Sequence, residues 1–432
     1  MKVLYVSQYY PPEACAPAAR VDCFTRDWAA SGADVSVLTG FPNHPEGIVH
    51  ADYKKRWRRG FTSEERAGVK VYRSWLYPSA NQGLWGRGAN FSSFAFSAAV
   101  AGIGVAPGNG VVIATSPQIL VGLSGWAAAS LRFLPWVFEV RDLWPESLVG
   151  VGQSSANSLL YRSVGRVAKF LYRHATHIVV DGEWKRRHLI QQGVEVHRIS
   201  VIRNGVEENF CLDPNSSEAQ LARLKVRNEL GLRDEFVLLY AGTLGMAHGL
   251  ETILQAAERL RDHRDIAFIV MGAGAERAQL CRSIEDSRLA NVRLLEKQPR
   301  ERIPAILAAA DACLVPLRNQ EVFKSAIPSK MFEAMAAGKP AILGVEGEAK
   351  EILLASDAGL AVQAEDPGAM VAATLKLRND RSYCLTLGRN GRQAVMERYL
   401  RRTEAAKYFG LLAELSARQK VLAAREPVTI SE

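Results

Sequence analysis

The segment 326–340 combines, in one short stretch, the residue types that suggest chemistry most clearly. It reads Ala-Ile-Pro-Ser-Lys-Met-Phe-Glu-Ala-Met-Ala-Ala-Gly-Lys-Pro. Ser329 is a good N-cap residue, strong helix formers follow it, and Gly338 with Pro340 ends the run. We therefore expect a helix over 330–337 whose two ends are well defined.

The N-terminus of this expected helix is suited to binding phosphate. Its free backbone N–H groups and the positive end of the helix dipole attract anions, and Lys324 and Lys330 add positive charge beside them. Glu333 lies one turn further on, where its carboxylate could accept two hydrogen bonds from the diol of a ribose. A surface helix with an ion pair between Lys330 and Glu333 is the alternative interpretation.

Two glycine-rich loops, 241–249 and 272–274, each follow an expected strand. The first reads Ala-Gly-Thr-Leu-Gly-Met-Ala-His-Gly and lets the backbone approach a ligand closely, although it lacks the Gly-Lys-Ser/Thr of a Walker loop. The second, Gly-Ala-Gly, is a weak dinucleotide fingerprint because Arg277 stands where a third glycine belongs, so hydride transfer is disfavoured. The candidate binding residues of the two loops are Gly242, Thr243, Gly245, His248 and Gly272.

Three polar segments in the first half of the chain also follow expected strands, at 9–20, 40–47 and 138–146. The last reads Phe-Glu-Val-Arg-Asp-Leu-Trp-Pro-Glu and places Arg141 and Asp142 directly after a buried strand. Because the carboxyl ends of parallel strands share one sheet edge, the three segments should face one ligand site. Any single charge among them is more often part of a salt bridge than a catalyst.

Motifs for several other kinds of chemistry are missing from the sequence. It has no Asp-x-Asp pair, no His-x-x-x-His and no His-Glu-x-x-His, so we expect no metal and no other cofactor. It has no Gly-x-Ser-x-Gly nucleophile motif. The six cysteines form no Cys-x-x-Cys pair and the N-terminal apolar run is short, which favours reduced thiols in the cytoplasm and no signal peptide.

Strand-like apolar runs alternate with helix-like segments along the whole chain. The runs are 3–6, 35–38, 69–72, 111–114, 136–140 and 177–180 in the first half, then 236–241, 266–271, 292–295, 312–316 and 340–344. This alternation predicts an α/β protein with parallel sheets that helices cover on both faces.

The pattern restarts once, so we expect two Rossmann-like domains, 1–200 and 201–400, with a hinge near 200–215 and a helical tail over 401–432. Asn-Gly at 204–205 marks a turn in the hinge. Two open sheets joined in this way would place their ligand edges across one cleft.

The net charge is concentrated in the first half. The chain has 54 Lys and Arg against 45 Asp and Glu, a net charge of +9, and 22 of the basic but only 14 of the acidic residues lie within 1–200. The segment 53–61 reads Tyr-Lys-Lys-Arg-Trp-Arg-Arg-Gly-Phe, and no acidic residue lies between Glu65 and Glu139. This cationic, aromatic surface suits an anionic membrane face or phosphates; a solvated basic loop is the alternative.

The weakly polar stretch 91–105 bears on the same question. It is shorter than the roughly 20 apolar residues that a membrane span needs. We therefore expect an interfacial or buried helix there rather than a transmembrane one.

Taken together, these motifs resemble family 4 of the retaining GT-B glycosyltransferases over nearly the whole chain. Shared in the family's order are Pro-Pro-Glu at 11–13, Asn-Gly in the hinge, both glycine loops and the Phe-Glu-Ala-Met-Ala-Ala-Gly-Lys-Pro run. The chain is similar, more narrowly, to the O-antigen, capsule and colanic-acid subgroup that includes fucosaminyltransferases. That similarity lies in Thr-Gly-Phe-Pro-Asn at 39–43, Arg-Asp-Leu-Trp-Pro-Glu-Ser at 141–147 and Ile-Pro-Ser-Lys at 327–330.

The chain departs from the family pattern at its phosphate-binding positions. Ser325 stands where members commonly carry the first Glu of an E-x7-E motif, and Thr243 and His248 stand where Arg and Lys are frequent. Arg141 replaces a frequent His. Our hypothesis is that Lys330, with Lys324 and the Ser329-capped helix N-terminus, binds the diphosphate instead. Ser325 stays among the expected donor-binding residues.

The resemblance implies a GT-B fold and transfer of a sugar, such as an N-acetylated deoxyhexose, from a UDP-linked nucleotide donor. Retention of configuration and independence of metal are implied too. The acceptor would be polyprenyl-diphosphate-linked or an oligosaccharide, in O-antigen, capsule or exopolysaccharide biosynthesis at the inner face of the cell membrane. Donor binding would belong to the second domain and acceptor binding to the first.

The resemblance also implies roles for five residues of the first domain. Arg141 and Asp142 would orient acceptor or sugar hydroxyls, while Glu13, Arg20 and His44 would lie on the acceptor side. A UDP-sugar 2-epimerase of the same fold is one alternative, which needs acid and base groups at the sugar. A basic nucleic-acid-binding protein is another, but no groove-reading or base-stacking motif is present, so we expect no nucleic-acid partner.

Overall fold

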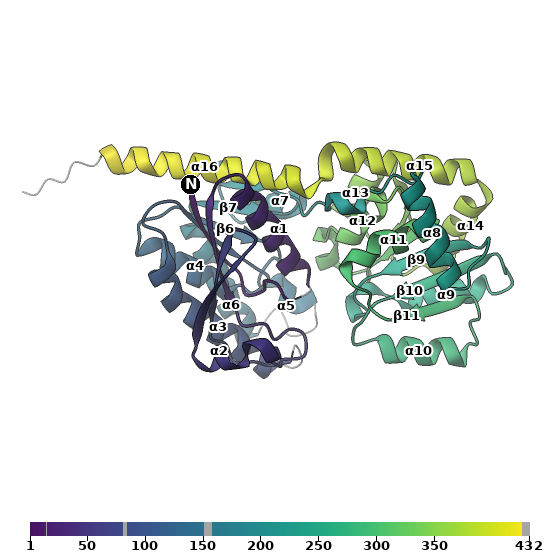
Figure 1. The fold of residues 1–432 in the computed structure, drawn as a ribbon, viewed down its shortest axis with the longest axis horizontal. Helices are drawn as coiled ribbons and strands as arrows, with labels where there is room; N and C mark the ends of the chain where they lie inside the picture. The colour runs from purple at the N-terminus through teal and green to yellow at the C-terminus, as the bar shows by residue number, and fades with distance from the viewer. Residues whose placement is uncertain (14, 81–83, 151–157, 426–432) are drawn as a thin grey trace, which may run out of the picture. The chain divides into compact units, whose positions relative to one another are not determined.

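The computed structural model describes residues 1–13, 15–80, 84–150 and 158–425, and these form two compact units. Unit 1 comprises Met1–Arg203 together with the chain from Arg402 onward, and unit 2 comprises Asn204–Arg401. Each unit contains a largely parallel sheet covered by helices on both faces (Figure 1). The predicted α/β architecture of two Rossmann-like domains is confirmed.

The sheet of unit 1 has eight strands in the order β3-β4-β2-β1-β5-β6-β7-β8. Neighbouring strands are parallel, except that β3 and β4 pair antiparallel at one edge. The strands are β1 Lys2–Val6, β2 Asp34–Gly40, β3 Phe61–Arg66, β4 Val69–Ser74, β5 Val111–Thr115, β6 Trp136–Val140, β7 His177–Val180 and β8 Ile199–Val201.

All six strand runs expected in this half lie within strands, whereas β3 and β8 were not predicted. β3 reads Phe-Thr-Ser-Glu-Glu-Arg and has no fully buried residue, so it lacks the apolar pattern of a core strand. β8 is only three residues long. Both therefore depend on pairing with neighbours that a local pattern does not reveal.

Helices enclose this sheet with an apolar core on each face. One core includes side chains of α3, α4, α6 and α7, and the other includes side chains of α1 and α16. The helices of unit 1 are α1 Ala16–Ala30, α2 Lys54–Arg58, α3 Leu84–Val105, α4 Leu120–Ser130, α5 Glu146–Gly150, α6 Leu159–His174, α7 Glu183–Gln191 and α16 Arg401–Arg425, with short 3-10 turns at Ala51–Tyr53 and Val196–Arg198.

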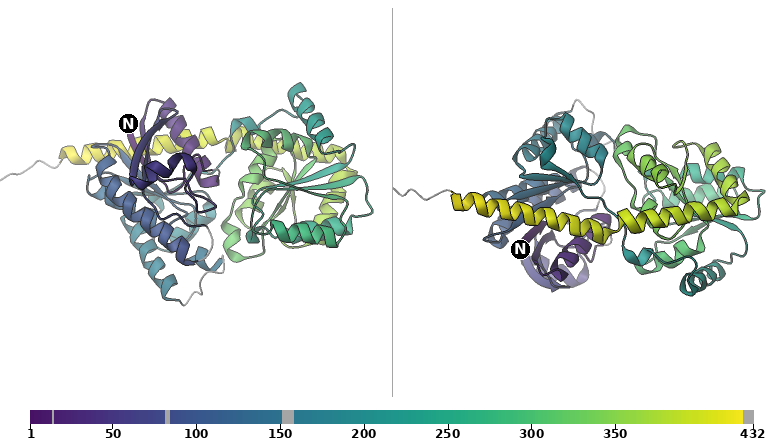
Figure 2. Two further views of the ribbon diagram at one scale, coloured as in Figure 1. Left: turned by 60° about the horizontal axis from the view of Figure 1, so that its bottom comes forward. Right: turned by 90° about the horizontal axis from the view of Figure 1, so that it is seen from above.

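The C-terminal helix α16 is part of unit 1 over its length from Arg402 to Arg425, whereas the sequence suggested a separate tail (Figure 2). The Trp28 indole donates a hydrogen bond to the Ala405 carbonyl at 2.8 Å, and Tyr408 packs edge-on against the same indole at 5.3 Å between ring centroids. Because Trp28 lies 377 positions earlier in the chain, no local pattern could predict this packing.

Unit 2 contains a six-stranded parallel sheet in the order β11-β10-β9-β12-β13-β14, again with an apolar core on each face. Its strands are β9 Phe236–Ala241, β10 Ile266–Met271, β11 Val292–Leu295, β12 Ala312–Pro316, β13 Ala341–Gly344 and β14 Gly359–Ala361. Its helices are α8 Ser217–Glu229, α9 Glu251–Arg259, α10 Arg277–Asp286, α11 Ile303–Ala309, α12 Ser329–Ala336, α13 Glu348–Ala355, α14 Pro367–Asn379 and α15 Arg381–Ala394.

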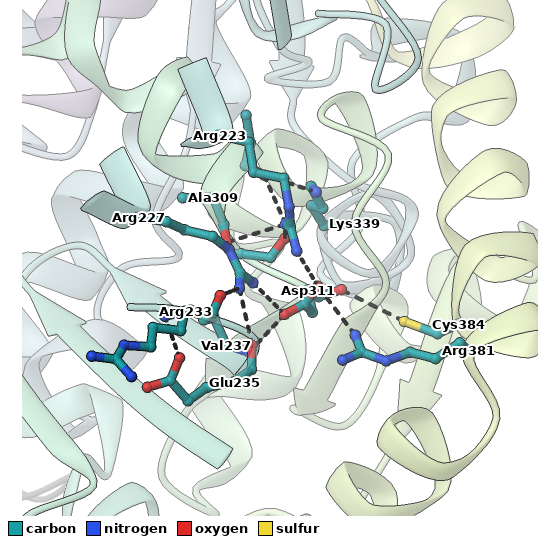
Figure 3. A network of polar contacts seen from close by, with 12 residues as sticks. Arg223, Arg227, Arg233, Glu235, Val237, Ala309, Asp311, Lys339, Arg381 and Cys384 are labelled. Atoms are coloured by element: carbon teal, nitrogen blue, oxygen red, sulfur yellow. Dashed lines mark hydrogen bonds and ion pairs between the residues drawn. The ribbon is translucent and has the colours of Figure 1, made fainter. Parts of the chain in front are cut away.

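A buried carboxylate fixes the amino edge of this second sheet (Figure 3). Asp311 immediately precedes β12 and forms ion pairs with Arg223, Arg227 and Arg381 at 2.8, 2.7 and 3.2 Å. It also accepts a hydrogen bond from the Val237 N–H of β9 at 2.7 Å. Burial alone would raise the pKa of Asp311, but these partners outweigh it and hold the pKa below its usual value.

Candidate functional site

The two glycine loops of unit 2 pack closely at the carboxyl edge of the sheet. A Cβ at Gly272 would lie 1.8 Å from the Gly242 carbonyl oxygen, and a Cβ at Gly274 would lie 2.1 Å from the Leu244 carbonyl oxygen. Any side chain at these two positions would therefore force the loops apart. Gly249 ends the first loop in the left-handed region at φ 56°, which favours glycine. The glycines thus hold two backbone loops side by side.

Lys330 meets the first of these loops from α12. Its ammonium donates a hydrogen bond to the Tyr240 hydroxyl at 2.8 Å and lies 4.2 Å from the centre of the Tyr240 ring. The Tyr240 hydroxyl donates in turn to the Thr243 carbonyl at 2.6 Å. A Cβ at Gly242 would come within 2.8 Å of the Lys330 nitrogen. The lysine, the tyrosine and the loop therefore form one site.

The charge state of Lys330 is sensitive to its surroundings. Burial lowers the pKa of the Lys330 amine to about 7, although the nearby Glu333 carboxylate opposes the shift. A bound anion would favour the charged ammonium and raise this pKa again. The lysine can therefore take up a proton as a phosphate binds.

His248 also packs against Tyr240. The two rings meet edge-on with centroids 6.1 Å apart. Burial and the charge of Lys330 lower the pKa of His248 to about 3, so the imidazole is neutral at pH 7. Within the described part of the chain, its Nδ1 is buried and has no hydrogen-bond partner. Gly245 shapes the turn here by accepting a hydrogen bond from the His248 N–H at 2.9 Å.

The carboxylate of Glu333 lies near two arginines, Arg300 and Arg401. Its carboxylate lies 3.6 Å from the Arg300 guanidinium. Burial raises the pKa of Glu333, while Arg300, Arg401 and Lys330 partly offset this. Lys330 bonds to Tyr240 instead of Glu333, and most of α12 is buried, so the alternative of a surface helix with an i, i+3 ion pair is wrong.

One expectation about the start of α12, that Ser329 caps the helix, needs correction. The helix runs Ser329–Ala336 with Pro328 as N-cap and no side-chain capping bond, so Ser329 is the first helical residue and does not cap the helix. Lys324 is paired with Glu321 at 2.6 Å on the preceding 3-10 turn, and Ser325 is a buried residue that ends this turn. The Lys324 ammonium therefore has an acidic partner of its own.

In unit 1, Arg141 and Asp142 follow β6 directly, as predicted. The backbone N–H groups of both residues donate to the Ser116 hydroxyl, at 2.8 and 3.3 Å. Lys185 donates to the Arg141 carbonyl at 2.5 Å and to Asp181 at the same distance. Loops after three neighbouring strands thus hold this turn in place.

The side chains of this turn remain available. Two guanidinium nitrogens of Arg141, Nε and Nη1, are buried without a hydrogen-bond partner among the described residues. Burial raises the pKa of Asp142, and Lys185 and Arg141 partly counter that shift. A guanidinium with two unbonded nitrogens beside a carboxylate is suited to holding a hydroxyl-rich ligand.

Glu13 organises the loop after β2. One carboxylate oxygen accepts hydrogen bonds from the N–H groups of Asn43 and His44, both at 3.0 Å. The other oxygen is buried without a partner in the described chain, and burial raises the pKa of Glu13 to about 7. His44 packs edge-on against Tyr9 at 5.1 Å.

Beside this loop lies a small pocket. Its lining comes from the loops after β1, β2 and β4 and from the first turns of α3: Tyr9, Asn43, His44, Ser79, Arg87, Asn90 and Phe91. Gln8 donates to Asn90 at 2.5 Å, and Asn90 donates to Asn43 at 3.2 Å. These hydrogen bonds therefore hold two of the lining residues, Asn43 and Asn90, in place.

Arg20 departs from its expected place on the acceptor side. Its side chain is 2% exposed and forms an ion pair at 2.6 Å with Glu139, which also accepts a hydrogen bond from Tyr5. The remaining guanidinium nitrogens donate to the carbonyls of Ile202 and Arg203. Arg20 thus fixes the end of unit 1 and lies too deep to touch a ligand.

Two contributors to the unit 2 site were missed. In the sequence, Tyr240 is indistinguishable from the other core residues of a buried strand. Only its position next to the end of β9 indicates that its hydroxyl could reach a polar group. Arg300 lies in a charged stretch outside any motif, yet it contacts Glu333 and Glu207 and stacks on Phe210. No group of three or more His, Cys, Asp or Glu in the described residues could hold a metal ion.

Two family models match the chain in sequence. A model described as a glycosyl transferase 4-like domain matches residues 17–205, and one described as glycosyl transferases group 1 matches residues 201–394. WcaI of Escherichia coli (strain K12), assigned by inference to the glycosyl transferases of colanic acid biosynthesis, is 26% identical over 359 residues, which are 80% of this chain and 84% of WcaI. AmsK of Erwinia amylovora, an amylovoran biosynthesis glycosyltransferase, is 28% identical over 198 residues, 45% of each chain.

Solved structures share the fold over nearly the full length. A sucrose-phosphate synthase from Thermosynechococcus elongatus has a TM-score of 0.76 at 20% identity and covers 96% of this chain and 99% of its own. Anabaena HepE in complex with UDP-glucose has a TM-score of 0.69 at 18% identity, with coverages of 96% and 100%. WaaG, a glycosyltransferase involved in lipopolysaccharide biosynthesis, has a TM-score of 0.67 at 14% identity, with coverages of 93% and 98%. The expected GT-B fold is confirmed.

Proposed function

The chain is a glycosyltransferase built from a 4-like domain and a group 1 domain, and on this premise we propose the reaction that it catalyses. It transfers a sugar from a UDP-linked donor to a polyprenyl-diphosphate-linked or oligosaccharide acceptor, with retention of configuration and without a metal. The sugar belongs to the N-acetylated deoxyhexose class. The product serves O-antigen, capsule or exopolysaccharide biosynthesis.

The donor side of this proposal is carried by the contact between Lys330 and Tyr240 beneath the glycine loop. The Lys330 ammonium bonds to the Tyr240 hydroxyl rather than to the nearby Glu333 carboxylate, so its charge is available to a diphosphate. The close-packed loops bring backbone groups to the same edge of the sheet. A UDP-glucose complex of Anabaena HepE, which shares the fold, supports a UDP-linked donor.

Glu333 takes the ribose in this scheme. Its carboxylate lies one helical turn beyond Lys330, and its contact with Arg300 is 3.6 Å long, which leaves its oxygens able to accept hydrogen bonds from a diol. A bidentate contact of this kind would fix the nucleoside while Lys330 holds the phosphates. The two residues thus divide the recognition of the nucleotide.

Catalysis with retention follows from positioning and charge. The acceptor hydroxyl attacks the anomeric carbon on the face from which the nucleotide leaves, and a donor phosphate oxygen takes its proton. Lys330 stabilises the negative charge that develops on the departing diphosphate. Arg141 and Asp142 hold hydroxyl groups in place for this step. No enzyme nucleophile takes part.

The acceptor occupies unit 1, where His44 lines the pocket and Glu13 holds the loop that carries His44. Arg87 at this pocket supplies a cation for a phosphate of a lipid-linked acceptor. The protein works at the cytoplasmic face of the membrane, which the basic helix α2 contacts through Lys54, Lys55, Arg56 and Arg58. The name of WcaI, with its place in colanic acid biosynthesis, supports a polysaccharide product.

A donor panel tests the proposal. UDP-sugars and GDP-sugars are each incubated with a polyprenyl-diphosphate-linked acceptor, and release of the nucleoside diphosphate is followed by chromatography. We expect release from a UDP-sugar only when acceptor is present, and ¹H NMR of the product to show the anomeric configuration of the donor. A change in the sugar of UDP-GlcNAc without acceptor would instead identify a 2-epimerase, and an inverted product would refute retention.

A further inference from the structure

Helix α3 presents to solvent a face without a single charged side chain. The buried side of the helix is formed by Asn90, Phe94, Ala98 and Gly102, which repeat every four residues. The opposite side carries Trp85, Ala89, Ser92, Phe96, Val100 and Ile103, all of them exposed. Arg87 is the one charged residue in the sequence Leu84–Val105.

The exposure of the large side chains on this face is unusual for a helix of a globular domain. Trp85, Phe96 and Val100 are 93%, 75% and 61% exposed. A surface helix normally places charged residues on its outer side. Contiguous apolar surface of this extent marks a site where something other than water covers the protein.

The apolar surface continues beyond α3 at both of its ends. Near the C-terminal end, Arg132 donates to the Ile103 carbonyl and places its neighbours Leu131 and Phe133 beside the helix, both largely exposed. Near the N-terminal end, the Tyr77 N–H donates to the Ser93 hydroxyl at 2.8 Å. Tyr77 is half exposed, so its ring adds to the same surface.

A basic helix adjoins this surface. The Trp57 indole of α2 donates to the Leu76 carbonyl at 3.0 Å and stacks on Trp75 at 6.4 Å between ring centroids. Ser97 of α3 donates to the Trp75 carbonyl. These contacts join α2, with Lys54, Lys55, Arg56 and Arg58, to the exposed face of α3. Cations therefore flank an uncharged apolar strip.

We propose that the outer face of α3 inserts into the headgroup region of an anionic lipid bilayer while α2 contacts the lipid phosphates. This proposal rests on the membrane association proposed above and adds that apolar insertion, not charge alone, anchors the protein. Cations beside apolar and aromatic side chains are the chemistry that an anionic membrane surface selects. A soluble protein partner would offer no reason for so many basic residues beside the strip.

The helix lies on the membrane and does not cross it. Among the described helices, Trp85–Val105 alone is long and apolar enough to span a bilayer, and it is longer than the stretch 91–105 singled out in the sequence. Its inner stripe nevertheless packs in the core of unit 1, and Asn90 is hydrogen-bonded to Gln8 and Asn43. Spanning would break this packing and these bonds. Insertion of the outer stripe leaves both intact.

Insertion of α3 would also bring the pocket of unit 1 to the membrane surface. Arg87, Asn90 and Phe91 line the pocket from the first turns of α3, the helix that would lie at the bilayer. A phosphate attached to a membrane lipid would reach Arg87 without leaving the interface. The inserted helix would thereby place the acceptor and its pocket at the same depth.

Vesicle binding of the full-length protein tests the proposal. Phosphatidylcholine vesicles with and without phosphatidylglycerol are titrated at low and high salt, using wild type, the double variant Phe96→Ser with Val100→Ser, and a matched control, Leu221→Ser with Leu224→Ser on α8. The four substituted residues are all exposed, so both variants should fold: they are Phe96 and Val100 on α3 and Leu221 and Leu224 on α8. We expect the α3 variant to bind anionic vesicles at least tenfold more weakly and the α8 variant to bind like wild type.

Trp85 provides a direct readout of depth. Brominated lipids should quench part of the tryptophan fluorescence of wild type, and Trp85→Phe should remove that part. Unchanged vesicle binding by the α3 variant, or absence of quenching, would overturn insertion while leaving membrane association through α2 intact. A dimer that the α3 variant dissociates, in a protein that ignores vesicles, would show that a second copy covers the face and would also overturn it.

Transfer to a water-soluble acceptor, measured in parallel, separates this inference from the proposed function. Transfer without vesicle binding would refute insertion and leave the reaction standing. Insertion of a protein that transfers no sugar from any donor would refute the reaction and leave the inference standing.

Discussion

The ammonium of Lys330 donates a hydrogen bond to the hydroxyl of Tyr240 at 2.8 Å and lies over its ring, beneath the glycine loop of unit 2. Lys330 comes from the first turn of α12 and Tyr240 from the end of β9, 90 positions apart. The tyrosine holds the cation in place without neutralising it. Recognition of the donor diphosphate depends on this contact in our account.

Replacing Lys330 by Ala should impair donor use. A charge-assisted contact contributes about 1.5 to 3 kcal/mol, so the donor KM should rise and kcat should fall, each by more than about tenfold. Steady-state kinetics with the preferred UDP-sugar measure both. Lys324→Ala is the matched control, because Lys324 forms an exposed pair with Glu321 and should change kinetics by less than about threefold. Near-normal kinetics of Lys330→Ala would contradict the assignment.

Donor binding should become weaker as the pH rises above 7. The pKa of Lys330 is lowered to about 7 in the free protein, so above that pH the amine is neutral and must take up a proton when it binds a diphosphate. The dissociation constant of UDP should therefore be flat below pH 7 and rise with pH above it. Calorimetry at pH 8 in buffers of different ionisation enthalpy should detect this proton uptake, and Lys330→Ala should abolish it.

Asp142→Asn should lower kcat strongly with only a modest change in KM. The backbone of residue 142 is held by Ser116, so the variant keeps the loop in place and removes only the charge. A residue that positions a hydroxyl in the transition state affects turnover more than binding. Ser116→Ala, which loosens the loop but keeps the carboxylate, is the comparison. Unchanged turnover of Asp142→Asn would rule out a positioning role.

Glu13→Gln should stabilise the protein at neutral pH and not at acidic pH. Burial raises the pKa of Glu13 to about 7, so the folded state binds a proton more tightly than the unfolded chain, and the stability this contributes below about pH 4.5 is lost as the pH rises to 7. Glutamine keeps an oxygen for the Asn43 and His44 N–H groups. The variant should gain about 2 to 3 kcal/mol in urea unfolding at pH 8. A gain of equal size at pH 5 and pH 8 would contradict the burial argument.

Asp311→Asn should destabilise unit 2. The substitution leaves Arg223, Arg227 and Arg381 without the carboxylate that they share. Arg227 is buried, and removing the partner of a buried charge costs about 3 kcal/mol. Asp265→Asn, which removes a half-exposed pair with Arg378, should cost less than about 1 kcal/mol. Urea unfolding of the two variants measures the loss in the free energy of unfolding. Equal losses would show that the Asp311 network stabilises unit 2 no more than an exposed ion pair does.

Much of the fold could be predicted because short segments of the sequence carry the apolar pattern or the capping residues of their own strand or helix. The apolar runs of β1, β9 and β10 are continuous, and α12 lies between Pro328 and Gly338. Features that rest on partners far away in the chain were missed. Edge strand β3 has no apolar face of its own, and α16 shows its role only when Tyr408 meets Trp28.

The candidate site divides in the same way. Lys330, Glu333 and the glycine loops stand out by residue type and spacing, and the structure gathers Lys330 with Gly242 and Thr243. Tyr240 was missed because a tyrosine in an apolar run resembles core. Arg20 was misplaced because a charge near a loop resembles a ligand contact, whereas burial against Glu139 makes it part of the core.

Mass spectrometry of the lipid acceptor tests the central claim most directly. The full-length protein is incubated with a polyprenyl-diphosphate-linked sugar and the UDP-sugar that the donor panel selects, alongside Lys330→Ala and Asp142→Asn. We predict an acceptor heavier by one glycosyl residue with wild type and little or no product with either variant. An acceptor of unchanged mass with every nucleotide sugar would contradict the account.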